Sequence, residues 1–263
     1  MTTRQSVAKF RNSVRAIGVG RTLLRSARYV QFALGRRELA RRTRERLAAN
    51  TIEERFTRIY ESNYWGSSES ASGQGSTLEQ TRDLRAQLPA LLERFRIRSV
   101  FDAPCGDFHW MQHVLVQCRV DYVGADIVAP MIDELSRTHA GPATRFVHVD
   151  ITKGPFPPAD LWLCRDCLFH LSYADIAAAL RVFVASGIPY ILTTTHENVD
   201  GYFINTDIRT GDVRRIDLFA APFHLPRTVL AQLNDGSTTE HPRRMLCLWK
   251  RDDVAAALAR GRY

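Results

Sequence analysis

An aspartate ends or follows each of four predicted strands in the middle of the chain. The predicted strands and their aspartates are 99–103 with Asp102, 122–127 with Asp126, 145–151 with Asp150, and 161–164 followed by Asp166. Short apolar runs separated by helical patterns predict parallel strands, whose carboxyl ends meet at one edge of the sheet. Ligands of such sheets bind at that edge. We therefore expect the four carboxylates to surround one ligand site.

The carboxylates of the second and third strands suit an adenosine. A carboxylate at the end of the second strand can accept hydrogen bonds from both ribose hydroxyls, which is the role we expect for Asp126. Asp150 can accept a hydrogen bond from the adenine amino group, and Ile127 and Ile151 would form apolar walls for the ring. The pattern predicts an adenosine subsite.

The turn after the first strand indicates which kind of adenosine compound binds. It runs from Asp102 to Asp107, and these two carboxylates flank it. A pyrophosphate needs a glycine-rich turn without nearby negative charge, whereas two carboxylates favour a cationic ligand. An adenosine that carries a sulfonium and an amino acid fits this electrostatic pattern.

Three residues are candidates for moving a proton. Asp166 and His170 are four residues apart, and His196 follows a fifth predicted strand, 190–195. An imidazole titrates near neutral pH, so we expect His170 or His196 to be the base and Asp166 to orient it or hold a metal ion. Each also has a structural interpretation: packing or a strand-end hydrogen bond for the histidines, and a salt bridge for Asp166.

A metal ion is a second candidate cofactor. Oxygen and imidazole ligands for Mg²⁺ are available from Asp166, His196, Asn198, Asn205 and Asp207, although their spacing is not diagnostic. The run Cys164-x-x-Cys167-x-x-His170 lacks the second ligand pair of a zinc site, so zinc is disfavoured.

Alternating strands and helices must position these residues. Helices are predicted over 82–95, 110–116, 131–138 and 173–185, a hairpin over 201–218, a proline-bounded helix near 226–233 and a last strand over 245–250. This order predicts an α/β fold with a Rossmann-like doubly wound sheet, mostly parallel, with an antiparallel C-terminal hairpin strand. An N-terminal helical extension precedes it.

The positive charge of the chain is confined to that extension. Residues 1–50 contain 13 Lys and Arg and two acidic residues, whereas the other 213 residues contain 23 basic and 26 acidic ones. A body that modifies nucleic acid is expected to carry its own basic face, so nucleic acid is not an expected partner. The extension is interpreted as a solvated helix, a contact between copies of the chain, an amphipathic membrane-surface segment or a transit peptide.

We therefore predict three regions. Residues 1–50 form the Arg-rich helical extension, 51–81 a lid or substrate segment, and 82–263 the cofactor-binding domain. The middle region has aromatic residues at Tyr64 and Trp65, followed by a stretch of small polar residues over 67–77. As an alternative, this polar composition predicts a flexible linker.

No apolar run reaches the length of a membrane span and no secretory segment is evident, so we expect a cytoplasmic protein.

Residues 82–250 resemble the class I S-adenosylmethionine-dependent methyltransferases. Their glycine-rich D-x-G-x-G turn is here Asp102-Ala-Pro-Cys-Gly106, with a single glycine. The runs 64–66, 72–77, 102–110 and 193–196 are similar to a subgroup with a PCGD sequence followed by an aromatic residue. Bacterial sugar and polysaccharide methyltransferases belong there, including the mycobacterial type that methylates the 1-hydroxyl in methylmannose polysaccharide synthesis.

The resemblance and the strand ends together imply a set of site residues. The expected cofactor contacts are Trp65, Ser72, Gly73, Thr77, Asp102, Ala103, Cys105, Gly106, Asp126, Ile127, Asp150, Ile151 and Arg165. The expected substrate contacts are Tyr64, Asp107, His109 and Asn198. The implied activity is transfer of a methyl group from S-adenosylmethionine to a hydroxyl of a sugar or oligosaccharide. The alternatives are methylation of another small molecule or RNA, and a catalytically silent cofactor-binding protein.

Truncation tests the division into regions. Deleting residues 1–45 should leave the affinity for S-adenosylmethionine nearly unchanged, because the extension contributes no strand end. Calorimetric titration of the full and shortened chains measures this, and a loss of about tenfold or more would assign part of the cofactor site to the extension.

Overall fold

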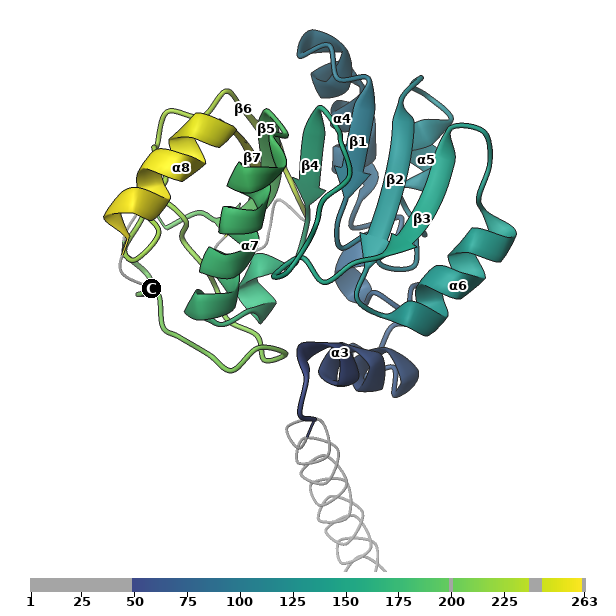
Figure 1. The fold of residues 1–263 in the computed structure, drawn as a ribbon, viewed down its shortest axis with the longest axis horizontal. Helices are drawn as coiled ribbons and strands as arrows, with labels where there is room; N and C mark the ends of the chain where they lie inside the picture. Colours follow the sequence, from purple (N-terminus) through teal and green to yellow (C-terminus); the bar gives the residue numbers. More distant parts are fainter. Residues whose placement is uncertain (1–48, 199–200, 237–242, 262–263) are drawn as a thin grey trace, which may run out of the picture. The chain divides into compact units, whose positions relative to one another are not determined.

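One mixed sheet organises the described part of the chain. The computed structural model describes residues 49–198, 201–236 and 243–261, so the extension predicted over 1–50 lies almost entirely outside them. Within these ranges, seven strands form a sheet in the order β3-β2-β1-β4-β5-β7-β6 (Figure 1). The strands are β1 Ser99–Asp102, β2 Asp121–Asp126, β3 Thr144–His148, β4 Leu161–Cys164, β5 Tyr190–His196, β6 Ala231–Asn234 and β7 Arg244–Lys250.

Helices and short 3₁₀ turns connect the strands. The helices are α3 Ile52–Glu61, α4 Arg82–Arg94, α5 Gln112–Leu115, α6 Ala129–Thr138, α7 Tyr173–Ser186 and α8 Arg251–Arg260, and the 3₁₀ turns are η1 Gln74–Ser76 and η2 Leu168–His170. None of the helices in the described ranges has the length and apolar character that crossing a membrane requires.

The predicted sheet type is confirmed. Strands β1 to β5 pair in parallel, whereas β7 runs antiparallel to both β5 and β6. From β1 the chain adds β2 and β3 on one side and β4 and β5 on the other, so β1 lies at the switch in strand order. Open α/β sheets bind their ligands at this switch point.

The location of the hairpin was predicted wrongly. Residues 201–218 contain no strand; the antiparallel pair is β6 with β7, and β6 occupies part of the helix predicted near 226–233. The physical reason lies in side chains that satisfy the backbone of the loop. Asn205 donates to the carbonyls of Asp217 and Ala221, so this segment needs no partner strand.

The core has two layers because both faces of the sheet are covered. Phe101, Trp162 and Trp249 pack in one buried cluster with residues of α7 and α8. Val100 and Leu161 point to the opposite cluster, which includes residues of α4, α5 and α6. Successive side chains of a strand alternate between faces, so strands covered on both sides become continuous apolar runs. This is why the strands could be recognised in the sequence as short apolar runs.

Asp102 is a buried acid at the end of the central strand. It is 2% exposed and accepts a hydrogen bond from the Tyr122 hydroxyl at 2.6 Å. Burial raises the pKa of Asp102 to about 7, although the Tyr122 hydrogen bond and the positive charge of Arg165 oppose that rise. Its carboxylate form therefore costs free energy of folding.

This cost gives Asp102→Asn a pH-dependent effect on stability. Because the pKa of the folded state lies above that of the unfolded chain, the penalty grows as pH rises from about 4 to about 7 and is constant above that. Asparagine retains an acceptor for Tyr122 and has no charge to bury. We expect its stability gain over the parent chain to be about 2 kcal/mol larger at pH 8 than at pH 5. Urea unfolding at the two pH values measures this, and an equal difference at both would contradict it.

Candidate functional site

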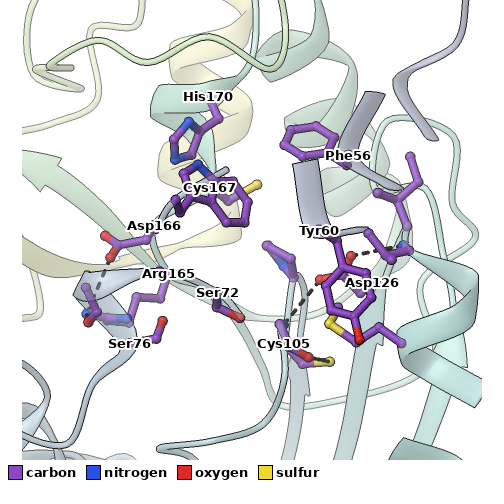
Figure 2. Close-up of a pocket in the computed structure, with 18 of the residues that line it drawn as sticks. Phe56, Tyr60, Ser72, Ser76, Cys105, Asp126, Arg165, Asp166, Cys167 and His170 are labelled. Atoms are coloured by element: carbon purple, nitrogen blue, oxygen red, sulfur yellow. Dashed lines mark hydrogen bonds and ion pairs between the residues drawn. The ribbon is translucent and has the colours of Figure 1, made fainter. Parts of the chain in front are cut away.

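A cavity of about 290 Å³ lies at the carboxyl ends of β1 to β4. Its walls come from α3, from residues 71–76, from the turns after the strands and from Arg244 at the start of β7. In the view of Figure 2, Phe56, Tyr60 and Asp126 lie on the right, and Arg165, Asp166 and His170 lie on the left. The predicted convergence of strand ends is thus present, with a helix and a loop added to it.

Asp126 is held in place by backbone amides. Its carboxylate accepts hydrogen bonds from the N–H groups of Gly106 at 3.2 Å and Val128 at 3.1 Å. Burial raises the pKa of Asp126 to about 6, while these backbone hydrogen bonds act in the opposite direction. The side chain lines the cavity with Ile127 at the end of β2, as predicted. The two backbone hydrogen bonds therefore orient the Asp126 carboxylate as an acceptor without a ligand being present.

Asp150 supplies a second acceptor after β3. It accepts hydrogen bonds from the backbone N–H of Thr152 at 2.9 Å and from its hydroxyl at 2.6 Å, and it pairs with Lys153 at 2.9 Å. Burial would raise the pKa of Asp150, but the Thr152 and Lys153 interactions outweigh burial and lower it. Asp150 and Ile151 both line the cavity, beside Asp126 and Ile127 in its lining; their contacts with an adenosine stay a prediction.

The turn after β1 fastens a loop over the cavity. Asp107 accepts hydrogen bonds from the Ser70 hydroxyl at 3.1 Å, the Ala71 N–H at 2.7 Å and the Ser72 hydroxyl at 3.1 Å. Gly106 has φ +54°, and a Cβ there would overlap the Ser72 hydroxyl, so a glycine is required. Asp107 does not line the cavity; where a substrate contact was predicted, the structure shows an anchor for residues 70–72.

A buried guanidinium fastens the same loop at its other end. Arg165 donates to the Gly75 carbonyl at 2.7 Å and to one oxygen of Asp235 through Nε at 2.9 Å and Nη2 at 2.7 Å. The Cζ atom of Arg165 also lies 5.4 Å from the centre of the Trp110 ring. Because Asp235 follows β6, this one side chain joins the end of β4 to the loop and to the far edge of the sheet.

Asp166 is an ion-paired acid rather than a base. Its Oδ2 lies 2.7 Å from Arg244 Nη1 and 3.4 Å from Arg165 Nη2. Burial would raise the pKa of Asp166, but the charges of Arg165 and Arg244 outweigh it and lower the pKa. The side chain is therefore a carboxylate at neutral pH that binds protons weakly and can accept hydrogen bonds in the cavity.

His170 lies in the cavity wall with a defined tautomer. Its Nδ1 is 2.9 Å from the carbonyl oxygen of Asp212, and its ring centre is 5.6 Å from that of Trp65. A carbonyl oxygen only accepts, so the neutral ring carries its proton on Nδ1 and its basic lone pair on Nε2. This is the form that a general base needs.

His196 lies outside the cavity lining. It is 6% exposed, its Nδ1 accepts a hydrogen bond from the Ile216 N–H at 3.2 Å, and its ring packs against Phe169 and Phe203. Burial lowers the pKa of His196 to about 4. These contacts match the structural interpretation of a strand-end histidine, so His170 becomes the stronger candidate for the base.

Five further predicted residues lie away from the cavity. Ala103 and Thr77 make internal hydrogen bonds, with the Trp162 indole and with the Gln74 carbonyl. His109 pairs with Glu69 at 2.9 Å, and Asn198 bonds the backbone of Phe203. Tyr64 is 37% exposed and is absent from the lining, whereas its neighbour Trp65 lines the cavity.

The metal expectation finds no support in the described ranges. No three His, Cys, Asp or Glu side chains there are grouped as a metal site requires. Asp166 is engaged by two guanidinium groups. The other proposed ligands lie outside the cavity lining: His196, Asn198, Asn205 and Asp207.

The sequence analysis assigned residues 51–81 to a lid or substrate segment, but it did not single out the lining residues of α3 and it missed one of the cations of the cavity. Ile52, Phe56 and Tyr60 of α3 all line the cavity. Their spacing of four residues is a helical stripe that could have been recognised. Arg244 gave no local signal, because only the antiparallel return of β7 beside β5 brings it to Asp166.

Comparisons with known proteins agree with this fold. Residues 100–186 match the family described as "Methyltransferase domain". Comparison with curated proteins gives no significant sequence match.

Several solved structures have a similar fold at low sequence identity. Human N-acetylserotonin methyltransferase in complex with SAM is 13% identical, covering 80% of this chain and 64% of its own, with a TM-score of 0.52. A Burkholderia thailandensis 1,6-didemethyltoxoflavin-N1-methyltransferase with bound S-adenosylhomocysteine is 14% identical, covering 76% and 86%, with a TM-score of 0.54. The magnesium protoporphyrin IX methyltransferase of Synechocystis with bound SAH is 11% identical, covering 73% and 93%, with a TM-score of 0.50.

The chain spans less than two thirds of the human protein's length, and none of these three is named for a sugar substrate. What they share with this chain is the sheet and its covering helices. Residues 100–186 are therefore similar to a methyltransferase domain, and the chain has the Rossmann-like fold that these solved methyltransferases share.

Proposed function

We propose that the chain transfers a methyl group from S-adenosylmethionine to a hydroxyl of a sugar or oligosaccharide, with His170 as the base. The observation that carries the proposal is a single cavity with two parts. Oriented acceptors for an adenosine line one side, and an imidazole with its proton on Nδ1 lines the other.

The residues present fit S-adenosylmethionine. Asp126 and Asp150 are acceptors for the ribose and the adenine amino group, and apolar side chains of Ile127 and Ile151 line the space between them. The buried carboxyl of Asp102, whose pKa is about 7, favours a cationic ligand because a nearby positive charge stabilises its ionised form. When bound, the cofactor supplies an electrophilic methyl group on a sulfonium.

The remaining chemistry is positioning and removal of one proton. A hydroxyl is a poor nucleophile at neutral pH, so a base within hydrogen-bond reach accelerates its attack. Nε2 of His170 has the lone pair for this step, and the Asp212 carbonyl stabilises the imidazolium that forms. Asp166 and the roof of α3 then hold the acceptor and exclude water.

A sugar acceptor fits the mixture of groups near His170. The Trp65 ring offers an apolar face for the C–H groups of a sugar ring, and the Asp166–Arg244 pair offers an acceptor and donors for its hydroxyls. RNA is a weaker candidate because residues 51–263 have a net charge of −3, from 23 basic and 26 acidic residues. The mycobacterial methylmannose type of acceptor remains part of this proposal.

Asp126→Ala tests the adenosine assignment. It removes two charge-assisted hydrogen bonds to the ribose, each worth ~1.5–3 kcal/mol, so the affinity for S-adenosylmethionine should fall by at least about tenfold. Asp133→Ala removes an exposed carboxylate from nearby α6 and serves as the matched control. Calorimetry on both variants, with thermal unfolding to check folding, decides the point; equal affinity in the two would place the ribose elsewhere.

His170→Gln tests the base. Turnover should fall by ~10²–10⁴-fold while cofactor affinity stays within a few-fold, because the loss affects proton removal only. The acceptor is first found by screening monosaccharides and oligosaccharides for transfer of a tritiated methyl group. His196→Gln is the control and should keep most of its turnover. Near-native turnover in His170→Gln would show that the proton leaves by another route.

A further inference from the structure

Residues 207–214 form a strap around the turn that carries His170. The Gly211 N–H donates to the His170 carbonyl at 2.7 Å, and the Asp212 carbonyl accepts from the His170 ring at 2.9 Å. On either side, the Arg214 N–H donates to the Phe169 carbonyl at 3.2 Å and the Ser172 N–H to the Thr210 hydroxyl at 2.8 Å. The backbone and the ring of His170 are thus held by two successive residues of one segment.

The strap is fixed at both ends to the helix that follows. Asp207 accepts a hydrogen bond from the Tyr173 N–H at 2.8 Å, at the first residue of α7. Arg214 donates to the Leu171 carbonyl at 2.6 Å and lies 5.1 Å from the centre of the Tyr173 ring. Between these ends, the Thr210 hydroxyl donates to Asp175 and accepts from the Ser172 N–H, and the Thr210 carbonyl is left to accept from another element.

Arg55 of α3 packs on that outer side. It is 7% exposed although it is a charged residue, and its Nη1 donates to the Thr210 carbonyl. Gly211 has φ +96°, and a Cβ there would overlap Cδ of Arg55, so the arginine stem crosses the strap where a side chain is lacking. Burying a guanidinium is costly unless hydrogen bonds compensate, which makes this contact more than incidental packing.

The same helix covers the cavity. Phe56, the residue after Arg55, lines the cavity together with Ile52 and Tyr60 (Figure 2 shows Phe56 and Tyr60). One helix therefore contacts the ligand space with one face and the His170 strap with another.

We infer that Arg55 is a positioning residue for His170: by holding Thr210 and crossing Gly211, it keeps the Asp212 carbonyl against the His170 ring while α3 covers the cavity. This rests on the proposed role of His170 as a base. Without Arg55, the strap moves away from the ring, Nδ1 loses its acceptor, and the proton redistributes between Nδ1 and Nε2. The fraction of His170 with a basic Nε2 then falls, so methyl transfer slows although the base itself is intact.

The experiment observes the ring directly in the full chain labelled with ¹⁵N on histidine. Nitrogen chemical shifts distinguish the two tautomers, and His170→Gln assigns the signals. In the parent chain we expect the proton of His170 on Nδ1. Arg55→Met, which keeps the stem and removes the guanidinium, should give an averaged pair of shifts, and Arg55→Lys should restore most of the original pattern. Arg58→Met makes the same chemical change at an exposed position of α3 and should leave the signals unchanged.

Unaltered His170 shifts in Arg55→Met would overturn the inference. If that variant does not fold, Gly211→Ala provides the same test, because it forces the strap and Arg55 apart without removing the charge. In either variant kcat should fall by about tenfold or more while the affinity for S-adenosylmethionine stays within about threefold. Failure of the proposed function has a different signature: His170→Gln would then keep its turnover, whatever the shifts in Arg55→Met show.

Discussion

The buried guanidinium of Arg165 is the interaction on which the site depends most. It follows β4, at the centre of the strand ends, and reaches both the Gly75 carbonyl and the carboxylate of Asp235. Its charge also holds Asp166 ionised beside Arg244. The charges of these two arginines and of Asp166 and Asp235 compensate the cost of burying one another. Removing one of the four would leave a buried charge without an adequate partner. The loop, the acceptor side of the cavity and the edge of the sheet therefore share one electrostatic support.

A second support is the carboxylate of Asp107, which holds residues 70–72. Asp107 and Arg165 hold the two ends of a short segment, 70–75, whose middle residues line the ligand space. A loop of small polar residues has little apolar area with which to pack, so its position comes from these charge-assisted hydrogen bonds. The same small residues let the backbone approach the turn at Gly106 closely. The hydrogen bonds to Asp107 and Arg165 therefore fix the position of the loop. Its composition alone would indicate a flexible linker, because it gives no sign of these distant partners.

The sequence was most informative where local periodicity coincides with a topological rule. Strands buried on both faces are recognisable as apolar runs, and parallel strands bring their ends together, so Asp126 and Asp150 were placed at the cavity correctly. The residues that were missed or misplaced depend on contacts distant in the sequence. His196 meets Ile216 across twenty residues, and Arg244 meets Asp166 across 78. No local pattern encodes such pairs, and the loop 201–218 was misread because side-chain amides replace the strand pairing that its composition suggested.

Cys105 illustrates what the charge of this cavity does to ordinary side-chain chemistry. Its thiol lines the ligand space, and burial, followed by the negative charges of Asp126 and Asp102, raises the pKa of Cys105 well above its usual range. Peroxides and alkylating reagents attack the thiolate, which is almost absent under these conditions. Burial, with a further contribution from the two carboxylates, thus protects the cysteine. The ligand space should keep its chemical integrity under oxidative stress that would modify a cysteine in a more positive environment.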